Sequence, residues 1–413
     1  ATDGEDPMSL ATFDYQVRDR AGKVVRGRID AESPTAVASK LKSMGYAPIS
    51  ITQANAGLNK EIKIPGVGNK VKLKDLAVSA RQFATMINSG LSLLRALAIL
   101  SDQTENKALA EVYGSVRLAV EQGSSLSQAL GQHPKVFPPI MVNMTRAGET
   151  GGFLDQVLVQ LADNFEAEVK LRSTVKSAMT YPLVVFAFAI ISMTAMLLFI
   201  VPVFSTMFEG LGGELPLPTR VLVMISNILK TGMPFIVILL IIGLILWKKY
   251  KHTPQVRNVV DPMKLKAPVF GPLFQKIALS RFSRNLGTMI HSGVPILQSL
   301  DIVADTTGNV VIARAVRDVE VSVRQGESLA GPLVNHPVFP PMVVQMMAVG
   351  EDTGSLDAML HKISDFYDQE VEATTEALTS LIEPIMIAVV GAIVGAMIVA
   401  LYMPIFKVFD LIE

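Results

Sequence analysis

Three long runs without a charged residue limit what this chain can fold into. They cover residues 177–208, 231–247 and 384–406 of the 413 residues. A transmembrane helix needs roughly 17–25 consecutive apolar residues, so the first and third runs are long enough and the second is at the short limit. The apolar stretch 221–229 either extends the second span or lies along the membrane interface. One such run would also suit a buried core helix, but three of them favour a multi-pass membrane protein.

The composition agrees with a membrane protein and excludes several other classes. Half of the residues are hydrophobic and 18% are charged, against about 25% charged residues in a soluble domain. Positive and negative charges balance, so nothing indicates a nucleic-acid partner or acidic substrates. The chain has no cysteine, which excludes disulfides, thiolate zinc sites and thiol nucleophiles.

An internal duplication is the second constraint. The sequence T-M-I-N-S-G at 85–90 returns as T-M-I-H-S-G at 288–293, an offset of 203 residues. The offset becomes 202 after H-P-K-V-F-P-P loses one residue to become H-P-V-F-P-P. The matched positions include Gly90 with Gly293, Gly123 with Gly326, Gly148 and Glu149 with Gly350 and Glu351, Pro182 with Pro384, and Pro202 with Pro404. Because the register persists into the apolar runs, a whole domain is duplicated, not a short solenoid repeat.

Lysine and arginine near the apolar runs predict the orientation. Lys170, Arg172 and Lys176 precede the first run, and Lys248 and Lys249 follow the second. By the positive-inside rule, the N-terminus is cytoplasmic, the first span runs outward and the second returns. The third span then runs outward, although its acidic inner flank gives this no support. The unrepeated second span therefore keeps both repeats on the cytoplasmic side.

The N-terminal segment is expected to form a small α/β module. The stretches F-D-Y-Q-V and V-V-R-G-R-I-D-A have the character of two strands joined by a turn. Ser33 and Pro34 have the character of an N-cap and the first residue of a helix. Gly45 would end that helix, and residues 47–51 would form a third strand.

The expected fold class is a mainly α membrane protein with two homologous cytoplasmic helical bundles, three transmembrane helices and the small N-terminal α/β module. We expect Met8 to be the native start, preceded by residues left from expression. The predicted divisions are 1–11 for the start, 12–53 for the α/β module, 54–74 for a basic linker, 75–180 for cytoplasmic helical repeat 1, 181–207 for transmembrane helix 1, 208–230 for an external loop, 231–247 for transmembrane helix 2, 248–277 for a cytoplasmic connector, 278–383 for cytoplasmic helical repeat 2, 384–406 for transmembrane helix 3, and 407–413 for an external tail.

Glycine and proline divide each repeat into several short helices. Leu76, Ala80 and Phe83 are spaced as one apolar stripe of a helix, and Gly90 would end that helix in the left-handed conformation. The other expected stops are Gly123 and Gly326, then Gly148 and Gly350. A last helix, at 153–176 or 356–380, would lead towards the span.

Motifs along the whole chain resemble one family. They are K-S-A-M-T-Y-P and I-V-P-V-F around the first span, the duplicated S-G…Q-G-x-S-L…F-P-P…G-E…G-x-L-D pattern, and the N-terminal F-D-Y-Q-V-R-D-R-A-G-K-V-V-R-G-R-I-D-A-E-S. The chain resembles the type II secretion system F and type IV pilus inner-membrane platform proteins over residues 12–410. The stretches E-I-K-I-P-G-V-G-N-K-V-K-L-K-D-L-A and G-E-L-P-L-P-T-R are more similar to the pilus branch. One departure is Glu383, where the first repeat has Tyr181.

The resemblance implies a non-enzymatic, multi-pass platform in the inner membrane. It would couple a cytoplasmic hexameric assembly ATPase to the extraction and polymerisation of pilin or pseudopilin. The lipid bilayer, other inner-membrane assembly components and further copies of the chain are the remaining expected partners. Arg81 and Arg284, on the first helix of each repeat, are the candidate motor contacts. A secretion-system platform is the alternative, and a small transporter is a weaker one because each repeat carries a single span.

The search for catalytic motifs finds none, and no cofactor is expected. G-x-x-x-x-G-K-[ST], H-E-x-x-H and G-x-S-x-G are all absent from the sequence. Glu149 and Asp155 are weak candidates for a cation site. The simpler interpretation makes them part of a helix stop, with Asp155 on a first helical turn where the helix dipole favours it.

The prolines of the spans have a more specific expected place. Pro182 and Pro384 are predicted near the first turn of their spans, where a missing N–H matters little. Pro202 and Pro404 are predicted at the far ends, as punctuation or kinks. Gly391 and Gly395 have the spacing of a close helix contact, with tolerance of glycine in lipid as an equal alternative.

Overall fold

The computed structural model describes residues 11–18, 24–31, 33–53, 70–209, 215–251 and 253–412. It divides into two compact units, the first ending at residue 68 and the second beginning at residue 69. Residues 1–10 of the predicted start, most of the predicted linker, the middle of the predicted external loop and His252 lie outside the described residues.

The N-terminal unit contains a three-stranded antiparallel sheet and one helix. The strands are β1 (Ala11–Arg18), β2 (Val24–Ala31) and β3 (Ala47–Gln53), in the order β2-β1-β3. Helix α1 (Pro34–Ser43) begins at Pro34, and the Ser33 hydroxyl accepts a hydrogen bond from the Ala36 N–H at 3.2 Å. Its buried residues Val37 and Leu41 join those of the sheet in a small core. The helix covers a ribbon that alone would be marginally stable.

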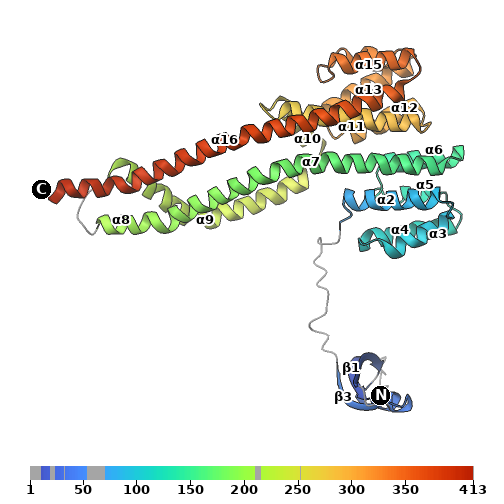
Figure 1. The fold of residues 1–413 in the computed structure, drawn as a ribbon, viewed down its shortest axis with the longest axis horizontal. Helices are drawn as coiled ribbons and strands as arrows, with labels where there is room; N and C mark the ends of the chain where they lie inside the picture. The colour runs from blue at the N-terminus through green and yellow to red at the C-terminus, as the bar shows by residue number, and fades with distance from the viewer. Residues whose placement is uncertain are drawn as a thin grey trace, which may run out of the picture. The chain divides into compact units, whose positions relative to one another are not determined.

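The second unit is helical and shows the duplication directly (Figure 1). The first repeat comprises α2 (Leu73–Asn88), α3 (Leu93–Gln103), α4 (Lys107–Glu121), α5 (Leu126–Gly131), α6 (Pro139–Gly151), α7 (Leu154–Ala195), a π-helical turn (Met196–Ile200) and α8 (Val201–Glu209). The second comprises α11 (Gly271–His291), α12 (Ile296–Thr306), α13 (Val310–Arg324), α14 (Ala330–Leu333), α15 (Pro341–Asp352) and α16 (Leu356–Ile412). The unrepeated helices α9 (Leu217–Tyr250) and α10 (Pro254–Lys266) connect them.

The two repeats fill the same core volume with different side chains. In repeat 1, the Tyr113 ring from α4 lies 5.6 Å from that of Phe137, and the Tyr113 hydroxyl donates to the Ser79 hydroxyl at 2.9 Å. In repeat 2, position 79 becomes Phe282, whose ring lies 5.2 Å from that of Phe339. The large ring thus comes from the first helix instead of from the third. Burial raises the pKa of Tyr113 to about 12, so its hydroxyl stays protonated as a donor.

The glycines that end helices are only partly those predicted. Gly90 and Gly123, with their copies Gly293 and Gly326, have positive φ angles and follow helix ends, as predicted. Gly148 and Gly350 were expected to end a helix, and that prediction is wrong. Both lie inside α6 and α15, and Gly152 and Gly354 take the left-handed conformation instead.

Gly148 and Gly350 serve the helix crossing that follows. A Cβ on Gly148 would lie 3.1 Å from the Leu154 Cα, and one on Gly350 would lie 2.9 Å from the Leu356 Cα. Those distances are too short for an unstrained side chain, so glycine lets the long helix begin directly against the preceding one.

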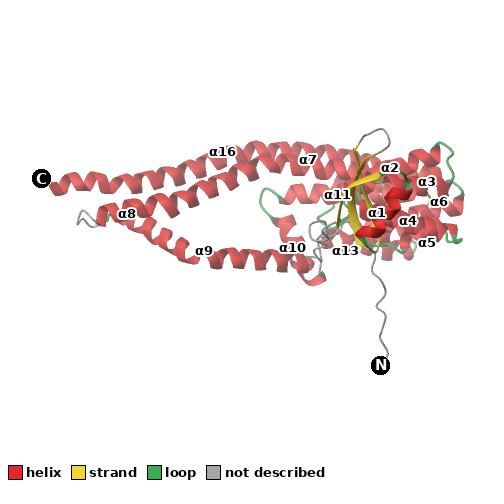
Figure 2. Ribbon diagram, turned by 90° about the horizontal axis from the view of Figure 1, so that it is seen from below, coloured by secondary structure: helices red, strands yellow, loops and turns green. Residues whose placement is uncertain are grey.

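Each long helix continues from its repeat through the apolar run. In the part of the chain that the structure describes, three helices are long and apolar enough to cross a membrane: Leu154–Met207, Leu217–Tyr250 and Leu356–Met403. Figure 2 shows α7 and α16 as long helices beside each other. The stretch 221–229 belongs to α9, so it extends the second span. Pro182 and Pro384 lie well inside these helices, so their predicted first-turn positions are wrong.

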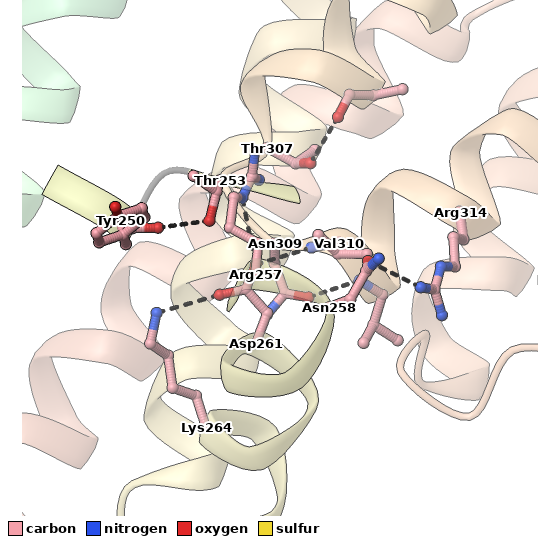
Figure 3. A network of polar contacts seen from close by, with 12 residues as sticks. Tyr250, Thr253, Arg257, Asn258, Asp261, Lys264, Thr307, Asn309, Val310 and Arg314 are labelled. Carbon is pink, nitrogen blue, oxygen red and sulfur yellow. Dashed lines mark hydrogen bonds and ion pairs between the residues drawn. The ribbon is translucent and has the colours of Figure 1, made fainter. Parts of the chain in front are cut away.

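The connector helix α10 is attached to repeat 2 by one buried carboxylate (Figure 3). Asp261 is 3% exposed and accepts a hydrogen bond from the Val310 N–H at 3.2 Å, at the start of α13. Lys264 donates to its other oxygen at 3.1 Å, and the Arg257 guanidinium lies within 3.6 Å. The chain that returns from α9 is therefore fixed to the second bundle.

Candidate functional site

The contacts of the two long helices form the candidate site, because these helices join both bundles to the apolar spans. Arg81 on α2 binds Glu166 on α7 through two hydrogen bonds of 2.7 and 2.8 Å, and it also pairs with Asp163. At the equivalent positions of repeat 2, Arg284 on α11 pairs with Asp368 on α16. The same ion pair thus joins the first helix to the long helix in each repeat.

The two arginines differ in exposure. Arg81 lies at the surface, where its hydrogen bond lowers the pKa of Glu166, whereas Arg284 is 6% exposed. In this conformation the Arg284 guanidinium faces Asp368 and Ser280. Both candidate motor contacts are therefore occupied by partners within their own repeat, and Arg284 is not on the surface.

The repeats contact each other through α7 of the first and α11 and α16 of the second. The Glu168 carboxylate accepts hydrogen bonds from Arg281 at 3.0 Å and from Arg172 at 2.6 Å. The Asn164 amide donates to the Asn285 side-chain oxygen at 3.2 Å. These polar contacts lie beside an apolar core that contains buried residues of both bundles.

The carboxylates of the repeated G-E motif cap short helices. The Glu149 carboxylate accepts hydrogen bonds from the backbone N–H groups of Leu126 and, at 3.1 Å, Ser127, at the start of α5. Glu351 does the same for Leu329 at 2.8 Å and Ala330 at 3.4 Å, at the start of α14. A negative charge on unsatisfied N–H groups stabilises a helix N-terminus. The arrangement gives both glutamates a structural function.

The aspartates proposed with them occupy another position. Asp155 and Asp357 lie in the first turns of α7 and α16. Asp357 pairs with His291 at 2.8 Å, and that hydrogen bond lowers the pKa of the carboxyl. Repeat 1 has Asn88 in place of His291. Among the described residues, no group of three or more His, Asp or Glu side chains is placed to hold a metal ion.

The prolines at the far ends of the spans each leave a backbone carbonyl free to accept a hydrogen bond from the unrepeated helix α9. In the π-helical turn, the Val201 N–H donates to the Met196 carbonyl. The next donor in that pattern would be residue 202, but proline has no N–H. The Leu197 carbonyl accepts instead from the Ser226 hydroxyl of α9, at 2.6 Å.

The third span repeats this solution. Pro404 cannot donate to the carbonyl four residues before it in α16, that of Ala400. The Thr219 hydroxyl of α9 donates to that carbonyl at 2.5 Å, and both α9 hydroxyl residues are buried. A serine or threonine of a neighbouring helix can satisfy a carbonyl that proline has released within a membrane. Pro202 and Pro404 thus do more than end their helices. Each leaves one backbone carbonyl without a backbone donor, and these two carbonyls accept the hydrogen bonds from α9.

The first and third spans share a small cavity at the ends nearest the helical bundles. Tyr181, Pro182, Glu383 and apolar side chains of α7 and α16 line about 260 Å³. The structure thereby brings together Tyr181 and Glu383, which hold the same position in the two repeats. Gly391 and Gly395 lie in open space, because a Cβ added to either would meet no described atom within 4 Å. They therefore make no close helix contact within the described part of the chain.

Sequence reasoning missed Ser226 and Thr219 because they are isolated hydroxyls in the segment 208–230, which was predicted to be a loop. A signal was available, because Pro202 and Pro404 each leave one backbone carbonyl without a donor and a hydroxyl of a neighbouring helix can replace that donor. It also missed the ion pairs of Arg81 and Arg284, although Glu166 and Asp368 hold the same position in the two repeats.

Comparisons with known proteins identify similar sequences along the whole chain. The family model for type II secretion system (T2SS) protein F matches residues 79–202 and again 282–404, and that for its N-terminal domain matches residues 10–52. Type IV pilus assembly protein PilC of Thermus thermophilus is 43% identical, covering 97% of this chain and 98% of its own length. PilC of Myxococcus xanthus is 42% identical, covering 98% and 97%. Type II secretion system protein F of Vibrio cholerae is 32% identical, covering 88% and 90%.

Proposed function

This chain belongs to the type II secretion system protein F family, and we propose that it is a non-enzymatic inner-membrane platform for type IV pilus assembly. In this proposal it couples a cytoplasmic assembly ATPase to the extraction and polymerisation of pilin. The higher identity to two PilC proteins than to the secretion protein favours the pilus branch. The N-terminus and both bundles lie in the cytoplasm, as the flanking lysines and arginines predict.

The continuity of the long helices carries the proposal. The first runs from Leu154 to Glu209 and the second from Leu356 to Ile412, each from a helical bundle into an apolar span. No loop interrupts either helix between its bundle and its span. A movement of a bundle is therefore passed to the membrane part as a movement of one rod. This is the property that a platform between a motor and a membrane substrate needs.

The motor contact is proposed on a pair of equivalent exposed apolar side chains. Leu118 on α4 and Val321 on α13 occupy the same position in the two repeats and are 50% and 55% exposed. Their exposure and their equivalent positions in the two repeats make them suitable probes of the surface that we propose for the motor. The buried Arg284 cannot serve in this conformation, so Leu118 and Val321 are the better sites for a crosslinking probe.

The rod hypothesis is tested by insertions between Lys176 and Ser177. A flexible Gly/Ser insertion of about seven residues should abolish pilus assembly in cells without their own copy, while the protein remains in the membrane. An alanine insertion of the same length adds about two helical turns and keeps the rod stiff, so it should retain much more assembly. Equal activity of both variants would show that stiffness is not needed.

The motor contact is tested by photocrosslinking in cells from Leu118 and Val321. We expect a product that contains the assembly ATPase from at least one position. Asn143, which donates and accepts hydrogen bonds inside the chain, is the matched control. If only the control position captures the ATPase, the proposed surface is wrong.

A further inference from the structure

A pocket of about 530 Å³ lies where the connector helix α10 meets helices α12 and α13 of repeat 2. Three arginines line it, Arg257 from α10 and Arg314 and Arg317 from α13. Asp305 of α12 is the one acid among the described residues that line it. Figure 3 shows Arg257 and Arg314 on the two sides of the junction between α10 and α13. The pocket therefore has more positive than negative charge on its walls.

The two arginines of α13 are only partly neutralised by their own partners. Arg314 donates to the side-chain oxygen of Asn258 at 3.0 Å, and this acceptor carries no charge. Arg317 pairs with Asp305 at 2.9 Å, but the two side chains are 59% and 62% exposed. An exposed pair of this kind contributes little stability, so an anion that enters the pocket can compete for Arg317.

The arginine of α10 shares its acid with other groups. The Arg257 guanidinium lies 3.6 Å from the Asp261 carboxylate, beyond normal hydrogen-bonding distance. Asp261 accepts hydrogen bonds from Lys264 at 3.1 Å and from the Val310 N–H at 3.2 Å. The Arg257 side chain is 33% exposed, so its guanidinium can turn towards a ligand in the pocket.

Repeat 1 has neither these arginines nor a helix that corresponds to α10. At the positions of Arg314 and Arg317 it has Glu111 and Gly114, whereas Asp305 has an identical copy in Asp102. The acid is thus common to both repeats, and the arginines are not. The arginines therefore accompany the pocket that α10 closes and are not required by the bundle that both repeats share.

The pocket lies close to the end of the second span. Helix α9 ends at Tyr250, whose carbonyl accepts hydrogen bonds from the Thr253 hydroxyl at 2.7 Å and from the Thr253 N–H at 2.9 Å. Pro254 follows directly, begins α10 and lines the pocket. The headgroup layer of a bilayer lies directly outside its hydrocarbon core. The chain thus brings the pocket near the phosphates of the membrane.

We propose that this pocket binds the phosphoryl group of a phosphate ester. A guanidinium has five N–H donors in a planar fork that matches the geometry of phosphate oxygens. Two sources supply this chemistry at the membrane surface, the headgroup of an anionic phospholipid and a soluble phosphorylated compound. A phosphate held between Arg257 and the α13 arginines would join α10 to α13, so binding should slow the local opening of α10.

Hydrogen exchange of the full-length chain tests the proposal, with peptides of α10 as the readout. In the lipid arm, the chain is reconstituted in nanodiscs of phosphatidylcholine with or without phosphatidylglycerol. In the soluble arm, the chain in a maltoside detergent receives inorganic phosphate, or chloride at the same ionic strength. In each arm the change caused by the probe is compared with the same protein without the probe.

Two variants remove the charge of the pocket and a third is the control. Arg314→Glu introduces the residue that repeat 1 has, and Arg317→Ala removes the second arginine of α13. Arg324→Ala is the matched control, because Arg324 lies on the same helix, is 66% exposed and pairs with Glu320. Peptides of α15 report whether each variant is folded, and Arg317→Ala provides the test if Arg314→Glu disturbs them.

Slower exchange of α10 confined to the lipid arm identifies the headgroup as the ligand, and slower exchange in the soluble arm identifies a soluble phosphate ester. Either result supports the proposal if Arg324→Ala retains the effect. Arg314→Glu should weaken binding about tenfold or more, which corresponds to the loss of one charge-assisted hydrogen bond. Unchanged exchange in both arms overturns the proposal. Protection that persists in the two pocket variants, or that Arg324→Ala removes equally, also overturns it.

Discussion

The Ser226 hydroxyl donates a hydrogen bond of 2.6 Å to the Leu197 carbonyl, the acceptor that Pro202 leaves without a backbone donor. The Thr219 hydroxyl does the same for Ala400 below Pro404. The unrepeated helix α9 is thus attached to both repeated spans through the backbone carbonyls that proline leaves without a donor.

Ser226→Ala should destabilise the membrane part by about 0.6–1.7 kcal/mol, the range for hydrogen bonds between membrane helices. The loss should be smaller in a Pro202→Ala background, because alanine provides the missing N–H. A double-mutant cycle on the free energy of unfolding in mixed detergent measures this coupling. Equal losses in the two backgrounds would mean that the carbonyl has another donor.

Arg284→Ala should destabilise the protein more than Arg81→Ala. Arg284 is buried although its partner Asp368 is 35% exposed, so the loss of this pair should cost more than the under about 1 kcal/mol that an exposed pair contributes. The two variants delete the same residue at equivalent positions, so each is the control for the other. Thermal unfolding of the purified chain gives the comparison. A larger effect at Arg81 would contradict the burial that the structure assigns to Arg284.

Glu149→Gln should loosen the start of α5 without changing the rest of repeat 1. The loss of a charged cap costs about 1 kcal/mol. Hydrogen exchange of a peptide that contains Leu126 and Ser127 should become faster, and Glu351→Gln should affect the start of α14 instead. The effect should be the same with added calcium or EDTA. A stabilisation by calcium that disappears in Glu149→Gln would favour the cation-site hypothesis.

Gly350→Ala and Gly148→Ala should both destabilise the crossing into the long helix, by about 1–3 kcal/mol, because the new methyl group overpacks the contact. Gly350 has the shorter distance and should show the larger effect. Gly131→Ala, where the nearest side-chain atom lies at 3.7 Å, is the control and should be tolerated. Unfolding temperatures of the three variants decide the order.

Acidification should destabilise repeat 2 through His361 and Asp357. Burial and the nearby His291 lower the pKa of His361, so the folded state binds its proton less readily than the unfolded state does. Stability is therefore lost as the pH falls below about 6.5, the value for a free histidine. Asp357 contributes stability at pH values above its pKa in the unfolded state, about 4. This contribution is lost as the pH falls through its lower pKa in the folded state.

The histidine variants separate these two effects. His361→Gln should flatten the decline of the unfolding temperature as the pH falls below about 6.5. His291→Asn, which introduces the residue found in repeat 1, should reduce the loss at more acidic pH because Asp357 then lacks its partner. An unchanged profile in His361→Gln would assign the acid sensitivity to other groups.

Sequence reasoning could predict the duplication, the spans and several helix ends because these depend on local signals. Gly90 and Gly123 end helices for a conformational reason that one residue reveals. The role of Gly148 could not be predicted in this way, because glycine is needed there for the close approach of Leu154 from another helix. Pro182 lies well inside α7, which begins at Leu154, because the first residue of an uncharged run marks a change of environment and not the start of a helix. Contacts between distant segments, such as Ser226 with Leu197, depend on packing that no local pattern contains.

The uninterrupted helix from Leu154 to Glu209 has a mechanical consequence. At 1.5 Å per residue it is roughly 84 Å long, so a tilt of about 5° at one end displaces the other by about 7 Å. This exceeds the pitch of one helical turn, about 5.4 Å. A small angular change at the bundle end thereby becomes a sideways displacement at the far end that is larger than one helical pitch.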